Sequence, residues 1–121
     1  MTALVVDDSQ ITRRVLKLAL KSHRIECCEA CDGAEALSIL TKNQSIAFVM
    51  VDWNMPNLSG YEFLKKVRSI SKYDQLKIFV VTASDTIETL ERAKAIGADD
   101  FLLKPISKSM IATKLSIHGL N

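Results

Sequence analysis

The chain has 121 residues, of which 48% are hydrophobic and 25% charged, and its formal net charge is +2. This length suits one domain with one core, and the composition is that of an ordinary globular protein. The basic residues are scattered and only 6% of the residues are aromatic, which argues against a nucleic-acid-binding face. No apolar run approaches the roughly 18 residues that a membrane span needs, and no secretory signal is visible.

Short β-branched runs alternate with segments of helical period along the whole chain. We expect strands at residues 3–6, 25–29, 46–51, 77–81 and 100–103, and helices at residues 9–21, 33–40, 60–68, 85–96 and 107–117. Five alternating strand–helix units predict one parallel sheet with helices on both faces. Right-handed crossovers are expected between its strands.

Several helix ends carry recognisable signals. Ser59 and Glu62 have the spacing of a capping box, in which the serine accepts from a first-turn amide and the glutamate reaches back. Asp85 and Glu88 repeat this spacing before the fourth helix. Gly97 can take the left-handed conformation that ends that helix.

Apolar residues at helical spacing predict which faces lie on the sheet. The rows that we expect to be buried are Phe63, Leu64 and Val67 in the helix at 60–68, and Ile11, Val15 and Leu18 in the helix at 9–21.

Polar side chains follow four of the predicted strands at the points where they end. Asp7 and Asp8 follow the first strand, Asp52 the third, Thr82 the fourth and Lys104 the fifth. The carboxyl ends of parallel strands meet at one edge of the sheet, where ligands of such folds bind. We therefore expect these residues to converge although they are far apart in sequence.

This constellation predicts a metal and phosphate site. Clustered carboxylates repel one another, and a divalent cation removes that cost; Mg²⁺ prefers oxygen ligands of this kind. The charge of Lys104 suits a phosphoryl group, and the Thr82 hydroxyl can hydrogen-bond to it. The chemistry that we infer is attack by a carboxylate on phosphorus, which gives an aspartyl phosphate during an in-line transfer.

These residues are arranged as in a known family. Its motifs are present as Asp7-Asp8, Asp52-Trp53-Asn54-Met55-Pro56, Thr82-Ala83, Gly97-Ala98-Asp99-Asp100-Phe101 and Lys104-Pro105. The chain resembles a response-regulator receiver domain of two-component signalling over residues 1–121, and residues 52–60 are especially similar to the single-domain chemotaxis messengers. The resemblance implies a flavodoxin-like (βα)5 three-layer α/β sandwich whose five-stranded parallel sheet has the order 2-1-3-4-5.

The resemblance also implies roles for single residues. Asp52 matches the phosphoacceptor, and Lys104 matches the partner of the phosphate. The ligands of Mg²⁺, or of Mn²⁺ in its place, would be Asp8 and Asp52 directly, Asp7 through water and the backbone carbonyl of Asn54.

Three further positions match the switching parts of the family. Thr82 matches the switch hydroxyl and Phe101 the aromatic residue that changes rotamer. Pro105 matches a proline that follows a cis peptide bond, here with Lys104.

The function that we expect is a phosphorylation-activated cytoplasmic switch. A sensor histidine kinase or phosphotransfer protein would supply the phosphoryl group, and a protein target would read the surface of the fourth helix, fifth strand and fifth helix. The chain would assist its own phosphorylation and dephosphorylation rather than act as a turnover enzyme. We expect a monomer or weak dimer that binds neither membranes nor nucleic acid.

Three alternatives stay open. A Mg²⁺-dependent phosphohydrolase would also use an aspartyl nucleophile, although such enzymes generally place it after the first strand and add a cap domain. An unphosphorylated scaffold is a second alternative, which the complete acid, threonine and lysine set disfavours. The chain could also be the N-terminal receiver of a longer DNA-binding or enzymatic response regulator.

The cysteines, Cys27, Cys28 and Cys31, form neither a disulfide framework nor a zinc site by spacing. Structural zinc usually requires four ligands, and His23 and His118 are isolated in the sequence. We expect free thiols in a reducing cytoplasm, with Cys31 the most exposed.

Overall fold

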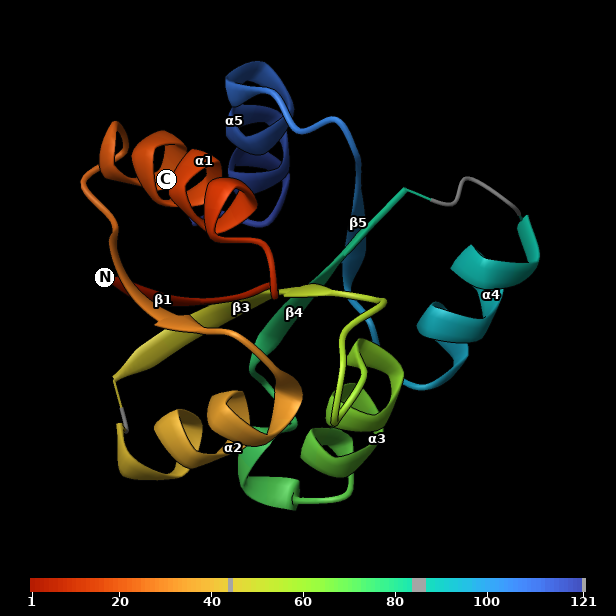
Figure 1. Ribbon diagram of the computed structural model, residues 1–121. Coiled ribbons are helices and arrows are strands. Elements are labelled where there is room, and N and C mark those ends of the chain that lie inside the picture. Colours follow the sequence, from red (N-terminus) through yellow and green to blue (C-terminus); the bar gives the residue numbers. More distant parts are fainter. Residues whose placement is uncertain (44, 84–86, 121) are drawn as a thin grey trace.

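The computed structural model describes residues 1–43, 45–83 and 87–120, in which five strands alternate with five α-helices (Figure 1). The strands are β1 (Thr2–Val6), β2 (Glu26–Ala30), β3 (Ile46–Asp52), β4 (Lys77–Thr82) and β5 (Asp100–Leu103). The helices are α1 (Gln10–Lys21), α2 (Gly33–Lys42), α3 (Gly60–Arg68), the 3-10 helix η1 (Ser71–Tyr73), α4 (Ile87–Ala95) and α5 (Lys108–Ile117). Within these residues no helix is both long and apolar enough to cross a bilayer.

All neighbouring strands are parallel, and their order in the sheet is β2-β1-β3-β4-β5. This confirms the predicted flavodoxin-like topology. Helices α1 and α5 cover one face of the sheet, while α2, α3 and α4 lie on the other (Figure 1). The winding reverses between β1 and β3, so the carboxyl ends of these two strands flank the expected ligand-binding crevice.

The central strands are apolar on both faces because helices cover both sides of the sheet. Strands β3 and β4 are buried almost throughout. Phe48 and Phe79 pack edge to face with ring centroids 5.8 Å apart. The predicted α3 row is confirmed, since Phe63, Leu64 and Val67 are fully buried.

The predicted helix-end signals are present where the structure describes them. Ser59 Oγ accepts a hydrogen bond from the Glu62 backbone at 3.2 Å, and the Glu62 carboxylate accepts from the Ser59 backbone at 3.4 Å. Gly97 has φ +111° just after α4, as predicted. The expected cap Asp85 lies outside the described residues.

The predicted buried row of α1 is wrong. Ile11, Val15 and Leu18 are 79%, 41% and 54% exposed. The residues that face the sheet are Leu16, Ala19 and Leu20. Helix α1 carries two apolar rows. The buried row includes the small residue Ala19, so it gave a weaker apolar pattern in the sequence than the exposed row. One row therefore packs in the core, and the other is exposed.

Candidate functional site

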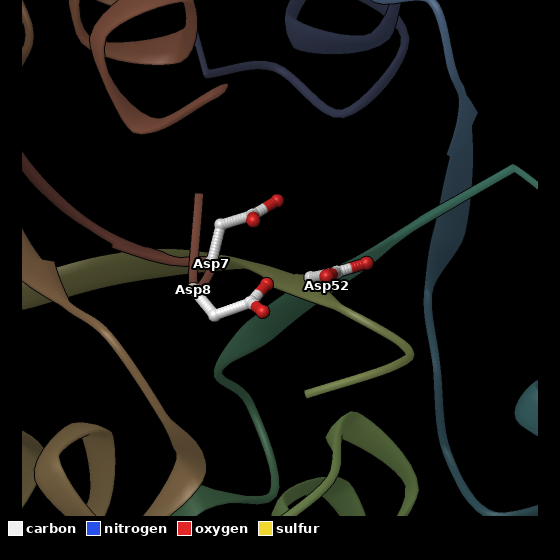
Figure 2. Close-up of side chains that lie close together, drawn as sticks. All are labelled: Asp7, Asp8 and Asp52. Carbon is white, nitrogen blue, oxygen red and sulfur yellow. The ribbon is translucent and has the colours of Figure 1, made fainter. Parts of the chain in front are cut away.

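The three predicted acids converge at the carboxyl edge of the sheet. Asp7 and Asp8 follow β1, and Asp52 ends β3, the neighbouring strand, in which Val51 pairs with Val6. One carboxylate oxygen from each acid lies within 4.8 Å of the other two (Figure 2). Asp7 is fully buried and Asp52 is only 5% exposed, whereas Asp8 is exposed.

Lys104 brings a positive charge to this cluster from the end of β5. Its Nζ lies 3.3 Å from Asp7 Oδ2 and 3.3 Å from Asp52 Oδ1. Its backbone N–H donates to the Thr82 carbonyl at 2.8 Å, which holds the loop after β5 against β4. The Lys104–Pro105 peptide bond is cis. One lysine facing three carboxylates leaves the cluster net negative.

Burial and the charge of Asp7 raise the pKa of Asp52, although Lys104 and a hydrogen bond from the Asn54 backbone oppose this shift. Partial burial lowers the pKa of Lys104, but the attraction of Asp52 and Asp7 outweighs it and leaves that pKa raised. Holding Asp52 ionised is therefore costly in the protein alone, and a bound cation would relieve the cost.

Asp7 shows that the site fits a divalent cation. Its Oδ1 accepts from the Ser9 backbone at 2.9 Å. Its Oδ2 is buried and has no hydrogen-bond donor among the described residues; Lys104 approaches it as an ion pair without hydrogen-bond geometry. Buried carboxylate oxygens normally have partners. The all-oxygen donors fit Mg²⁺, and each acid offers one oxygen to the cluster.

The other predicted site residues are Thr82, Asn54 and Phe101, which lie at the end of β4, in the loop after β3 and on β5. Thr82 is buried at the end of β4, one residue beyond Val81, the partner of Asp52 in the sheet. Asn54 is exposed in the loop after β3. Phe101 is half-buried on β5, where it packs against the core beneath α2, α3 and α4. Phe101 is therefore placed on the strand that leads to Lys104 rather than in the acid cluster.

An aromatic contact that the sequence did not predict lies beside Asp52. The Trp53 and Tyr61 rings pack edge to face at 5.7 Å. The Arg92 guanidinium of α4 lies 4.5 Å from the Tyr61 ring centroid, the geometry of a cation–π contact. This contact joins the loop after β3 to α3 and α4. The residues are too far apart in the sequence for a pattern to reveal it.

The cysteines take no part in the site. Burial raises the pKa of Cys27 to about 11. Cys31 is exposed, as predicted, but partial desolvation and the Glu35 carboxylate raise its pKa too. A raised thiol pKa leaves little of the thiolate that binds metals and reacts.

Comparison with known proteins agrees with this geometry. Residues 3–116 match the response regulator receiver domain. The chain is 36% identical over 116 residues to a chemotaxis protein CheY homolog of Campylobacter jejuni, covering 95% of this chain and 89% of that protein. It is 37% identical over 119 residues to the sensor histidine kinase RcsC of Escherichia coli, covering 98% of this chain but 12% of that protein.

Solved structures agree as well. The chemotaxis response regulator CheY4 of Vibrio cholerae superposes with a TM-score of 0.90 at 33% identity, covering 96% of each chain. The chain therefore belongs to the response regulator receiver domain family, whose members are phosphorylation-dependent signalling switches.

Proposed function

We propose that Asp52 accepts a phosphoryl group and that the phosphorylated protein presents a changed α4–β5–α5 surface to a protein target. The observation that carries this proposal is the edge cluster of three carboxylates, two of them paired with Lys104. The resemblance to receiver domains supports the assignment of Asp52, which is the acid at the end of β3. The cytoplasm is the compartment that we propose, because Cys27, Cys28 and Cys31 are free thiols, which suit a reducing environment.

The donor that we propose is a phosphohistidine of a kinase or phosphotransfer protein. An Asp52 carboxylate oxygen attacks phosphorus in line, the P–N bond breaks as the O–P bond forms, and the released imidazole nitrogen takes up a proton. Asp7, Asp8, Asp52 and the Asn54 carbonyl would hold Mg²⁺, which neutralises charge on the phosphoryl oxygens when bound. Lys104, which pairs with Asp7 and Asp52, supplies a second positive charge.

The switch that we propose connects Asp52 to α4 through β4 and β5. Phosphorylation adds roughly −1.5 to −2 charge at the edge of the sheet. The Thr82 hydroxyl turns toward this charge, and the Phe101 ring takes the space that it leaves. Helix α4 buries only Ala93 among its described side chains, so its position is loosely determined and easily biased.

We assign the exposed apolar row of α1 to contact with the phosphodonor. A shallow hollow of about 220 Å³ joins this row to the active edge, because Ile11 and Val15 line it together with Lys104 and Pro105. A donor seated over the hollow reaches Lys104, whose Nζ lies 3.3 Å from Asp52 Oδ1. Two exposed basic side chains beside the apolar row, Lys17 and Lys21, favour a donor with acidic groups.

A substitution on this row tests the assignment. We expect Val15→Asp to slow transfer from a protein donor by at least about 10-fold, while phosphorylation by acetyl phosphate is unchanged. Ile70→Asp is the matched control, since Ile70 is equally exposed at 41% but lies after α3 at the other edge of the sheet. Equal transfer to both variants would remove α1 from the donor interface.

Phosphorylation itself is tested by Trp53 fluorescence, because Trp53 follows the acceptor directly. We expect Mg²⁺ with acetyl phosphate, or with beryllofluoride, to change the emission of the wild type but not of Asp52→Asn. Mass spectrometry should find one phosphoryl group on the wild type. A phosphorylated Asp52→Asn protein would refute the choice of acceptor.

Two further assays separate the alternatives. Sustained turnover of external phosphoesters would favour the phosphohydrolase, whereas one phosphoryl group bound per chain favours the receiver. Pull-downs with beryllofluoride-treated and untreated protein should retain the target only after treatment.

A further inference from the structure

Arg13 joins the acid cluster to two other elements. Its Nη1 donates to the Asp7 backbone carbonyl at 2.6 Å, and its Nε donates to Glu29 Oε1 at 3.2 Å. Arg13 lies in the first turn of α1, and Glu29 lies on β2 beside Val5 of β1. The Arg13 side chain is only 16% exposed. It therefore connects β1, α1 and β2 directly behind the acids.

The Asp7 carbonyl belongs to the peptide group that leads into Asp8. Other hydrogen bonds hold Asp7 itself. Its N–H donates to the Ala30 carbonyl at 3.1 Å, and its Oδ1 accepts from the Ser9 N–H at 2.9 Å. The Asp8 side chain is exposed and has no surrounding core to fix it. Its direction depends on the plane of the 7–8 peptide group. The Arg13 hydrogen bond restrains this plane from the carbonyl side, together with the Ser9 bond that spans it.

We propose that Arg13 is a positioning residue for the cation site, held by Glu29, which orients Asp8 toward Asp7 and Asp52. This inference rests on the proposed function, because it assumes that the three acids bind Mg²⁺. Residues that hydrogen-bond to metal ligands orient them, and loss of such a residue typically weakens metal binding about 10- to 100-fold.

Charge and position predict opposite effects for this arginine. If only charge mattered, removing the positive charge of Arg13 from the neighbourhood of three carboxylates would strengthen their attraction for Mg²⁺. If Arg13 acts by positioning, removing its hydrogen bond to the Asp7 carbonyl lets the 7–8 peptide group rotate and weakens Mg²⁺ binding. The sign of the change therefore identifies which effect dominates.

The experiment is a calorimetric titration with Mg²⁺ alone, without a phosphodonor. We expect Arg13→Met to bind Mg²⁺ about 10- to 100-fold more weakly than the wild type. Arg14→Met is the matched control: it removes the same charge from the adjacent, exposed position of α1, and its Mg²⁺ affinity should equal or slightly exceed that of the wild type. Thermal melts without metal check that both variants fold.

Glu29→Gln gives a second test if Arg13→Met does not fold. It keeps the shape of the side chain that holds Arg13 but removes its charge, so Arg13 is held less firmly and Mg²⁺ binding should weaken several-fold. Loss of an anion also weakens the attraction for Mg²⁺ by charge alone, so the control is Glu26→Gln, which removes the same charge from an exposed position of β2. Mg²⁺ affinity at or above the wild-type value in folded Arg13→Met, or no greater loss in Glu29→Gln than in Glu26→Gln, overturns the role of Arg13. A wild type that binds no Mg²⁺ would instead refute the proposed function.

Discussion

Gly60 allows the start of α3 to pass directly against the strand end that carries Asp52. A Cβ atom at this position would lie 2.3 Å from the Asp52 carbonyl oxygen and 2.8 Å from the Trp53 Cα. Both neighbours are backbone atoms, so neither can rotate away. The Gly60 N–H also donates to the Trp53 carbonyl at 3.1 Å, which keeps the two segments together.

We expect Gly60→Ala to destabilise the fold and to displace Asp52. Cβ contacts need at least about 3.0 Å, so the two backbones must separate by at least 0.7 Å. Forcing extra atoms into a packed site costs about 1–3 kcal/mol, which lowers the Tm of a chain of this size by roughly 3–15 °C. A misplacement approaching 1 Å at a reacting group can slow the reaction by up to about 100-fold.

The assay combines a thermal melt with the rate of phosphorylation by acetyl phosphate. Gly119→Ala is the control, because Gly119 has φ +67° but a Cβ atom added there would meet, among the described residues other than its chain neighbours, no atom within 4 Å. It should lose about 1 kcal/mol from the left-handed backbone alone and keep the wild-type phosphorylation rate. If Gly60→Ala melts and reacts like the wild type, the close approach of α3 to Asp52 is refuted.

Three further substitutions probe other parts of the fold. Arg68→Met removes the guanidinium donor of three backbone carbonyls and one of the donors of Asp99, so the free energy of unfolding should fall by about 3 kcal/mol. An unchanged midpoint in chemical denaturation would refute this. Asp52→Asn should stabilise the metal-free protein, because the raised pKa of Asp52 makes its ionised form unfavourable in the fold. In thermal melts the Tm of the variant should rise above that of the wild type as pH increases through the carboxyl range, and the difference should vanish at lower pH. Asp100→Asn should remove stability that the wild type keeps near neutral pH and loses in acid: burial raises the pKa of Asp100, but hydrogen bonds from Lys114 and a histidine lower it overall. The two melts should converge in acid, and equal melts of that variant and the wild type near neutral pH would contradict this.

The site could be predicted from the sequence because the topology does most of the positioning. The three acids, Thr82 and Lys104 lie at or just after the ends of strands, and all parallel strands end at one edge. The polar residues that interrupt apolar runs, such as Asp52 after Val51, therefore identify the site without any knowledge of distances. The strands were equally clear, because burial on both faces requires continuous apolar runs.

Contacts between distant side chains could not be predicted in this way. His118 seemed isolated in the sequence, yet its Nε2 lies 2.9 Å from Asp100 Oδ2 and its ring packs against Phe79 at 5.0 Å. The α1 prediction failed for a related reason. A periodic row shows that a helix has an apolar face, but a helix with two such rows packs according to its neighbours.

The contacts of Arg68 restrict where a conformational change can occur. Arg68 donates to the Gly97 carbonyl at 3.0 Å and to Asp99 at 2.9 Å, and Asp99 accepts from the start of β4 at 2.8 Å. The end of α4 is therefore fixed to α3 and to the amino-terminal edge of the sheet. The first described residue of α4, Ile87, is 73% exposed by contrast, and α4 follows β4, the strand that ends at Thr82. We therefore expect a change that begins at Asp52 to tilt α4 about its Arg68-bound end without unfolding the core.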